Sequence, residues 1–549
     1  MNDGTPPNVA GTAVATGRRP SPAAGLRVPG PVLVTYALTQ LVLLFWWAVH
    51  HPGLFSPDSL VYITQSTTGT WNTHHPVTYT GLVWLSLQVF GGLGALTFLQ
   101  TVAMAVGLAY AVGGLRRLGV PGWLAAGAAV VVVALPPVGG FVIAVWKDVP
   151  FVICHVFLLG TLARAVARRR DGLRPVLPAG LLVAAAVEMT LICLFRQNGF
   201  IVVGIVAVAG VLLLRPAGRL LLAAVAAVTA ALLTNWALLP ALGVRDSESI
   251  VAYEAMFADI SVAYAANPAA FPTEHTEVMA RVAPLSHWRD SADCYHADTL
   301  TYARPFDRRA ASVHGDALVD VWVAALRRAP GTIVDARICR SSIGWNPLPA
   351  GTISRNPSAW GLPIFIERDP AFQQSPFSHT VRTRPLSERA HRIGMELTRL
   401  ANEPGVEWLL WRGATWTYVA YAVIGFAAWR RREPALLALA ALSAGNQISV
   451  MIVNNVQAAR YMAAPYVLGV LLLPLLAVRR NTPATAPAQR SGVDGAASPV
   501  GSTGTDKATV PAAEQALVGP GGDDAGPALP LQRGDHDGPT AQARVDERG

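Results

Sequence analysis

Apolar residues in this chain occur in long blocks that short polar segments separate. Leu181–Leu194, Val202–Leu214 and Leu220–Leu242 are three such blocks, with very few charges among them. Because a helix needs about 20 apolar residues to cross a hydrocarbon core of about 30 Å, such blocks and their flanks predict membrane-spanning helices. The pattern predicts ten of them, near residues 31–50, 94–115, 122–143, 149–167, 177–195, 199–214, 219–240, 407–429, 434–453 and 461–478.

One long polar region, residues 241–406, interrupts the series of apolar blocks. It carries short apolar runs and many aromatic residues, which favours a folded domain of the α or α+β class. Residues 1–30 and 479–549 are rich in Pro, Gly and Ala and lack hydrophobic periodicity, so we expect a disordered leader and a disordered tail. The expected fold is an all-α polytopic membrane protein, with transmembrane modules over 31–240 and 407–478.

The segment His75–Gly91 decides the expected topology. It fits either a short span or an amphipathic helix that lies in the membrane interface. The interfacial interpretation places the arginine clusters on one side, which the positive-inside rule assigns to the cytoplasm, whereas a span would move the later clusters outside. We therefore expect both termini in the cytoplasm, with the loop 51–93 and the domain 241–406 outside the plasma membrane. The clusters are Arg18/Arg19, Arg116/Arg117, Arg164/Arg168/Arg169/Arg170, Arg215/Arg219, Arg430/Arg431/Arg432 and Arg479/Arg480.

The composition agrees with a membrane protein. Hydrophobic residues make up 52% of the 549 residues and charged residues only 14%, whereas soluble domains carry about 25% charged residues. This excludes an ordinary cytosolic enzyme and an intrinsically disordered chain. The net charge of +9 comes from 43 basic and 34 acidic residues, and in a membrane protein it indicates orientation rather than a nucleic-acid partner. Only Lys147 and Lys507 are lysines, which singles out Lys147.

The four cysteines lie in two kinds of surroundings. Cys154 and Cys193 fall inside apolar blocks and are typical of small core residues. Cys294 and Cys339 fall in the polar region, and they predict a structural disulfide if that region faces an oxidising compartment. No C-x-x-C spacing typical of a metal site is present.

The expected topology brings several chemically active residues to the outer face. Charged groups near membrane depth are costly and commonly mark a site or a pathway. Two carboxylates suit a general base, and three cations suit a phosphate. The set is Asp58, His74 and His75 in the first loop, Trp146-Lys147-Asp148, Arg196-Gln197-Asn198, and Arg460-Tyr461.

Each of these residues also has a structural interpretation. Arginine and lysine at helix ends commonly anchor the helix in the interface. Asp58 and Asp148 each fit the cap of a following helix. His74 and His75 precede a proline and fit interfacial loop residues better than metal ligands. Glu188 and His155 lie within predicted spans, two turns from Arg196 and Asp148, and fit interhelical hydrogen bonds.

The order and common sidedness of six motifs resemble the GT-C superfamily of integral membrane glycosyltransferases, which includes protein O-mannosyltransferases and aminoarabinose transferases. The resemblance covers residues 31–240 and 407–478, and the acidic loop has Asp58-Ser59 where the family commonly has Asp-Glu. The motifs are Pro52-Gly53-Leu54-Phe55-Ser56-Pro57-Asp58-Ser59, His74-His75-Pro76, Leu115-Arg116-Arg117-Leu118-Gly119, Trp146-Lys147-Asp148-Val149-Pro150-Phe151, Phe195-Arg196-Gln197-Asn198-Gly199 and Ala459-Arg460-Tyr461-Met462.

The resemblance implies transfer of a sugar from a polyprenyl-phosphate donor to a cell-envelope glycan, lipid or protein at the outer face, within membrane lipid and without nucleic acid. An inverting transfer needs a base for the acceptor hydroxyl, which we assign to Asp58. Lys147, Arg196 and Arg460 are assigned to the donor phosphate. Asp148 would orient the acceptor or join Asp58 around a divalent cation. The residues expected to shape the acceptor side are His74, His75, Gln197, Asn198 and Tyr461.

Other functions make different predictions for the same residues. A transporter or flippase also needs interior charges, and Pro136-Pro137-Val138-Gly139-Gly140 fits a broken helix of the transporter type. Against it stand the absence of an internal repeat and the long outer domain. A polymerase or ligase of lipid-linked glycans differs mainly in its acceptor. A non-enzymatic envelope scaffold predicts dispersed charges, whereas any single site requires Asp58, Asp148, Arg196 and Arg460 to converge.

Overall fold

Helices account for the regular structure of this chain. The structure, a computed structural model, describes residues 29–170, 178–214, 218–248, 250–355, 366–367 and 370–478. Within these ranges it contains helices and isolated bridges but no strand. The chain is therefore a polytopic helical membrane protein, and the described part of 241–406 follows the α rather than the α+β expectation. The predicted leader, apart from its last two residues, and the predicted tail lie outside the described residues.

Six helical stretches among the described residues have the length and apolar composition of a membrane span. Several of them begin or end in a turn of 3-10 or π-helix. They are α1 (Gly30–Val49), α4 (Gly94–Arg117), α7 (Asp148–Arg170), α10 (Gly218–Leu233) extended through η1 (Thr234–Leu238) and α11 (Leu239–Ala241), η5 (Pro434–Leu439) with α25 (Ala440–Val453), and η6 (Ala459–Met462) with α26 (Ala463–Leu472) and η7 (Leu473–Ala477).

The predicted helix over 122–143 is broken, so the expectation of one continuous helix is wrong. α5 (Gly122–Ala134) and α6 (Pro136–Val142) meet at a bend of 76°. Leu135 between them is extended, with ψ of 129°, because a residue that precedes proline is disfavoured in the helical region. The pair forms a seventh span with a break, or a re-entrant segment, as the Pro136-Pro137 sequence had suggested for a transporter.

Three further predicted spans are weaker in the structure. α8 (Ala179–Phe195) has 17 residues and α9 (Gly199–Leu213) has 15, which is short for a bilayer core of about 30 Å. α24 (Gly413–Arg431) has 19 residues and follows the short helix α23 (Glu407–Leu410), but it is not among the stretches with the apolar composition of a span. The structure thus supports six or seven spans by length and composition, and the number of ten remains a prediction.

Small residues let the spanning helices approach closely. A Cβ on Gly114 of α4 would lie 2.6 Å from the carbonyl oxygen of Gly160 on α7, and one on Gly160 would lie 2.6 Å from the ring of Tyr110. Such contacts favour helix association where lipid and side chains are equally apolar. α7 is the most enclosed span, because 83% of its apolar window is buried against 33% for α1. α7 therefore places the residues at its N-terminus near the centre of the helix bundle.

The loop between α1 and α4 contains α2 (Pro57–Thr68) and α3 (Val77–Phe90). With 14 residues, α3 measures about 21 Å and is too short to span the bilayer. The side of α3 that packs on the protein carries both apolar and polar residues, since Tyr79, Val83 and Leu87 are buried together with Thr80 and Ser86. Its other side exposes Trp84, Val89 and Phe90. An exposed apolar side is typical of a helix that contacts lipid at the membrane interface.

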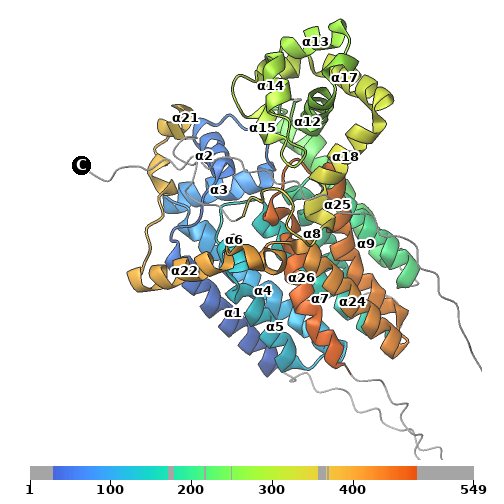
Figure 1. The fold of residues 1–549 in the computed structure, drawn as a ribbon. Coiled ribbons are helices and arrows are strands. Elements are labelled where there is room, and N and C mark those ends of the chain that lie inside the picture. The colour runs from blue at the N-terminus through green and yellow to red at the C-terminus, as the bar shows by residue number, and fades with distance from the viewer. Residues whose placement is uncertain are drawn as a thin grey trace, which may run out of the picture. The chain divides into compact units, whose positions relative to one another are not determined.

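The region 241–406 contains two differently packed parts. Its first part is a cluster of helices with its own core around Phe257, Trp288 and Leu318, and Cys294 and Cys339 form a disulfide within it. Figure 1 shows this cluster beyond the end of the helical bundle. Its helices are α12 (Ile250–Ala266), α13 (Thr273–Ala280), α14 (Leu285–Asp290), α15 (Asp298–Thr301), α16 (Arg308–Val313), α17 (Gly315–Arg328), α18 (Pro330–Arg340) and α19 (Ser342–Trp345).

The second part of this region lies against the transmembrane helices instead. α21 (Pro370–Gln373) packs near α2, where the hydroxyls of Thr67 and Ser375 are 2.9 Å apart. α22 (Glu388–Ala401) packs so tightly on α1 that a Cβ on Gly394 would lie 2.6 Å from Val49. In Figure 1, α22 runs across the spanning helices rather than along them. The region 241–406 is therefore not a single separate domain.

Three predicted arginine clusters meet at the opposite end of the bundle. Arg170 at the end of α7 donates a hydrogen bond of 2.8 Å to the carbonyl of Arg117 at the end of α4. Arg431 at the end of α24 donates one of 2.6 Å to the carbonyl of Leu118. This common position is what the positive-inside argument requires, so we expect this end to face the cytoplasm.

This orientation predicts opposite labelling of two introduced cysteines. Ala280 is exposed at the end of α13, and Ala179 is exposed at the start of α8. The native cysteines offer little background, because Cys154 and Cys193 are buried and the other two are paired. A membrane-impermeant maleimide should label Ala280→Cys in intact cells and Ala179→Cys only after permeabilisation. The reverse pattern would contradict the predicted topology.

Candidate active site

Asp58 lies in the first turn of α2 without serving as its cap. Ser56 precedes the helix, and the Ser59 hydroxyl closes the first turn by accepting a hydrogen bond of 3.0 Å from the Ser56 N–H. The helix begins at Pro57 rather than at Ser59. The capping interpretation of Asp58 is therefore replaced by one in which local serines finish the helix and leave the carboxylate free for other partners.

The loop between α1 and α4 is tied directly to the segment that precedes α7. The Leu54 N–H donates to the carbonyl of Ile143 at 3.1 Å, and the Val145 N–H donates to the carbonyl of Leu54 at 2.9 Å. Two side chains extend this pairing, because Ser59 donates to the carbonyl of Val145 at 3.0 Å and the Trp146 indole donates to Ser56 at 2.5 Å. These bonds bring α2 beside the start of α7.

Four of the predicted site residues form one ion-pair network. Arg460 donates a hydrogen bond of 2.8 Å to Oδ2 of Asp58, and the same nitrogen lies 3.8 Å from Oδ2 of Asp148. Arg196 donates to Oδ1 of Asp148. The Asp148 side chain is only 1% exposed, whereas those of Asp58, Arg460 and Arg196 are 18%, 16% and 13% exposed. Asp148 is thus the buried part of the network, and the other three residues form a rim that solvent reaches.

Aromatic rings hold the two guanidinium groups in place. Arg460 lies over the rings of Trp146 and Tyr461, at 4.6 and 5.4 Å from their centroids. Arg196 lies 4.7 Å from the ring of Tyr461 and 5.5 Å from that of Phe151. Arginine stacks well on aromatic faces. Tyr461 therefore lies between the two cations, a position that fits its predicted role in shaping the site.

Lys147 adds a cation to the network and pairs with His75. The Lys147 ammonium lies 2.8 Å from Nδ1 of His75. Burial lowers the pKa of His75 well below its usual value, and the nearby Lys147 lowers it further. His75 is therefore neutral at pH 7, and its Nδ1 accepts a hydrogen bond from the ammonium. The His74 ring packs 4.6 Å from that of His75.

The electrostatics of Asp58 favour the ionised carboxylate. Burial opposes its ionisation, but the neighbouring Arg460 and Lys147 outweigh burial and hold the pKa of Asp58 well below its usual value. At neutral pH the carboxylate is charged and can accept a proton. The same neighbours make it a weak base for as long as Arg460 remains its partner.

The helix cluster α12–α19 contributes groups that the sequence did not predict. Arg308 donates to Glu254 at 2.8 Å and lies 4.3 Å from the ring centroid of Tyr302. Asp298 at the start of α15 remains solvent-accessible. Desolvation and the nearby Glu254 raise the pKa of Asp298 to about 7. The charges of Arg460 and Asp58 also shift this pKa. Asp298 therefore lies close to the network.

Other predicted residues lie beside the network or away from it. Asn198 donates to the Ser449 hydroxyl at 2.9 Å and supports the turn that carries Arg196, while Gln197 is exposed. Glu188 accepts a hydrogen bond of 2.9 Å from Thr161, which matches its interhelical interpretation. His155 lies 2.8 Å from the carbonyl of Phe151 in its own helix. No ion pair joins Glu188 or His155 to the network among the described residues.

The acidic pair does not fit a divalent cation in this arrangement. No group of three or more His, Cys, Asp or Glu side chains able to hold a metal ion occurs among the residues that the structure describes. The carboxylates of Asp58 and Asp148 face the guanidinium groups of Arg460 and Arg196. A dication would have to displace these cations from both carboxylates, because hard cations require several oxygen ligands.

No protein-family model, curated protein or solved structure matches this chain. The function is therefore inferred from the geometry of the site.

The burial of Asp148 predicts strong energetic coupling between Asp148 and Arg196. Arg196→Met leaves a carboxylate that is 1% exposed with only the more distant Arg460, and an unpaired buried charge costs about 3 kcal/mol. We expect a clear fall in thermal stability of the purified protein, and Asp148→Asn in the Arg196→Met background should restore most of it. Independent, additive effects of the two substitutions would contradict this account.

Proposed function

We propose that this chain is a membrane glycosyltransferase that moves a sugar from a polyprenyl-phosphate donor to a cell-envelope acceptor at the outer face of the plasma membrane. The observation that carries the proposal is the network of Asp58, Asp148, Arg196 and Arg460 at the end of the spanning helices. It joins a carboxylate that solvent reaches to cations suited to a phosphate. The motif resemblance to the GT-C superfamily points to the same chemistry.

The proposed reaction is a single inverting displacement. The acceptor hydroxyl oxygen forms a bond to the anomeric carbon of the sugar, and the bond from that carbon to the phosphate oxygen breaks on the opposite face. The hydroxyl proton passes to Asp58, and the polyprenyl phosphate leaves with the electron pair. Arg460, Arg196 and Lys147 stabilise the charge that develops on this phosphate. Asp148 keeps Arg196 in place through their hydrogen bond.

Arg460 would couple donor binding to activation of the base. In the structure its guanidinium contacts Asp58 at 2.8 Å. A donor phosphate competes for the same donors, and bidentate arginine–phosphate pairing is favourable. When Arg460 turns toward the phosphate, Asp58 loses its strongest cationic neighbour and the pKa of its carboxyl rises. Asp58 then becomes a better proton acceptor only in the presence of the donor.

A transporter or flippase of lipid-linked or small envelope precursors is the second candidate. The observation that favours it is the bend of 76° between α5 and α6, because transporters commonly bind their substrates at broken helices. The ion-pair network does not involve this break directly. Arg460, Asp58 and Asp148 lie on η6, on α2 and at the start of α7. The two functions are separated by whether a covalent bond of the donor is broken.

Asp58→Asn should abolish turnover without preventing donor binding. Loss of a general base lowers kcat by about 10²–10⁴-fold, and the amide preserves the size of the side chain. The measurement is sugar transfer or release by purified protein in lipid, with a panel of polyprenyl-phosphate sugars. Asp290→Asn, on an exposed carboxylate of α14, is the matched control and should turn over normally. Arg460→Met should lower both kcat and donor affinity.

Normal turnover by correctly folded Asp58→Asn protein would end the base assignment. If no donor of the panel binds, and the protein instead moves a lipid-linked precursor across vesicles without cleaving it, the transporter candidate replaces the proposal.

The raised pKa of Asp298 predicts a pH dependence on the acceptor side. Its carboxyl, with a pKa of about 7, is neutral below that pH and charged above it. If the charged form accepts a hydrogen bond from the acceptor, kcat/KM for the acceptor should fall as the pH drops through about 7. Asp298→Asn should flatten this limb of the profile. An unchanged acid limb in Asp298→Asn would exclude Asp298 as its source.

A further inference from the structure

A pocket away from the ion-pair network lies where the outer loops meet the ends of α1 and α4. It has a volume of about 500 Å³ and is lined by residues from the end of α1, from the connection between α3 and α4, and from the segment 379–384. None of its lining residues belongs to the network described above. The pocket therefore requires an explanation of its own.

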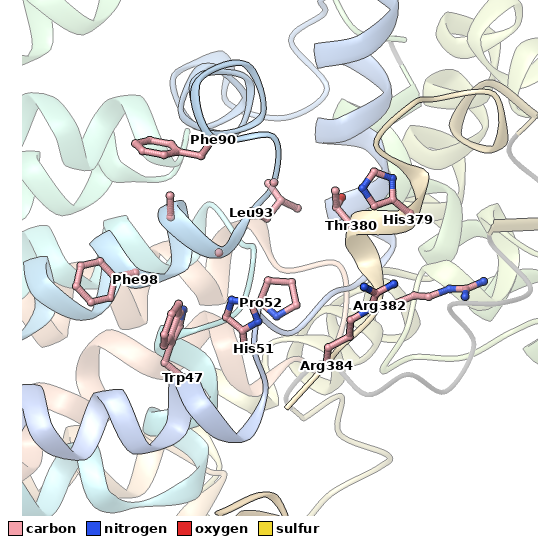
Figure 2. Close-up of a pocket in the computed structure, with 13 residues that line it drawn as sticks. Trp47, His51, Pro52, Phe90, Leu93, Phe98, His379, Thr380, Arg382 and Arg384 are labelled. Atoms are coloured by element: carbon pink, nitrogen blue, oxygen red, sulfur yellow. The ribbon is translucent and has the colours of Figure 1, made fainter. Parts of the chain in front are cut away.

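The two sides of the pocket differ in chemistry. Figure 2 shows the rings of Trp47, Phe90 and Phe98 on one side and the side chains of His379, Arg382 and Arg384 on the other. The Phe90 side chain is 64% exposed, and that of Phe98 is 38% exposed. Among the residues that the structure describes, no acidic side chain lines the pocket. Its charge is therefore positive, and its apolar wall is continuous with the lipid-facing side of α3.

The backbone that carries the two arginines is fixed, whereas their side chains have no acidic partner. The Arg384 N–H donates to the carbonyl of His51 at 2.5 Å, and the Leu386 N–H donates to that of Ala48 at 2.9 Å. The Thr383 hydroxyl donates to the carbonyl of Gly53 at 3.3 Å. Arg382 and Arg384 are exposed and form no ion pair among the described residues. The fixed backbone thus places two guanidinium groups beside the aromatic side of the pocket.

The pocket lies beside the ends of two candidate spans, because α1 ends at Val49 and α4 begins at Gly94. Spans end where the hydrocarbon core meets the lipid headgroups. α22 starts four residues after Arg384 and leaves Ile393, Leu397 and Leu400 exposed along one side. An apolar face on a helix that crosses the spans is typical of the membrane interface. Aromatic side chains are enriched at the same level.

We propose that this pocket binds the phosphate headgroup of an anionic membrane phospholipid. Arg382 and Arg384 contact the phosphate, and Trp47, Phe90 and Phe98 contact the first carbons of the acyl chains. A zwitterionic lipid is disfavoured, because its ammonium group finds no carboxylate in the lining. Arginine suits phosphate through its planar set of donors. This lipid is distinct from the sugar donor, and the inference does not depend on the proposed transfer reaction.

Native mass spectrometry of the purified full chain tests this proposal. The protein is released from mixed micelles of phosphatidylglycerol and phosphatidylcholine, and retained lipid is counted for each variant. The test variant is Arg382→Ala/Arg384→Ala. The control is Arg389→Ala/Arg392→Ala, which removes the same charge from exposed positions on neighbouring α22. Phosphatidylglycerol retention should fall at least about tenfold in the test variant, equivalent to about 1.4 kcal/mol, and stay unchanged in the control.

Equal retention in the two double variants would overturn the proposal, because a general surface charge would then explain the binding. Competition separates a lipid from a free anion. Millimolar inorganic phosphate or glycerol phosphate should leave phosphatidylglycerol bound, and complete displacement by either would show a soluble-anion site instead. If the double variant does not fold, Arg382→Gln and Arg384→Gln are compared singly, and the same loss of retention is expected in each. Unchanged retention in both single variants would again overturn the proposal.

Discussion

The buried carboxylate of Asp148 is the constraint on which this part of the structure depends. Its side chain is 1% exposed, and one of its oxygens has no hydrogen-bond partner. A charge in this position is tolerable only beside cations. Those cations come from the turn after α8 and from the start of the last span, through Arg196 and Arg460. One charge thereby fixes the meeting point of three distant parts of the chain.

The same arrangement that neutralises Asp148 prepares the proposed chemistry at its rim. Arg460 contacts the buried carboxylate only at 3.8 Å and gives its closer hydrogen bond to Asp58, at 2.8 Å. The partner of Arg460 is thus a group that solvent reaches. An incoming phosphate can take this cation without leaving Asp148 unpaired, because Arg196 remains bound to it. The structural pair of Asp148 with Arg196 is therefore more deeply buried than the proposed functional pair of Asp58 with Arg460.

Much of the membrane part and most of this network could be predicted from the sequence. Apolar blocks indicate spans because lipid imposes their length, and charges near membrane depth are few, so Asp58, Asp148, Arg196 and Arg460 stood out. The apolar pattern continues through the break at Leu135 and predicted one helix there, although the two prolines that follow had also suggested a broken helix. The sequence missed Asp298, because charged residues are common in 241–406 and only the tertiary fold selects the one that lies close to the network. The sequence also did not predict the pocket with Arg382 and Arg384, because three distant segments that share no motif form it.

The helix cluster α12–α19 is built onto the segment that precedes Arg460. Asn454 and Gln457 donate hydrogen bonds of 2.6 and 2.7 Å to the carbonyl of Arg340, and Arg340 itself pairs with the buried Asp259 at 2.6 Å. The N–H of Ala297, beside Asp298, donates to the carbonyl of Asn455 at 2.9 Å. Residues three to six positions before Arg460 therefore set the place of Asp298 as well. Because buried polar contacts of this kind have few alternatives, the donor and acceptor sides of the proposed site share one rigid support. A shift of this helix cluster would have to move Arg460, and with it the partner of Asp58.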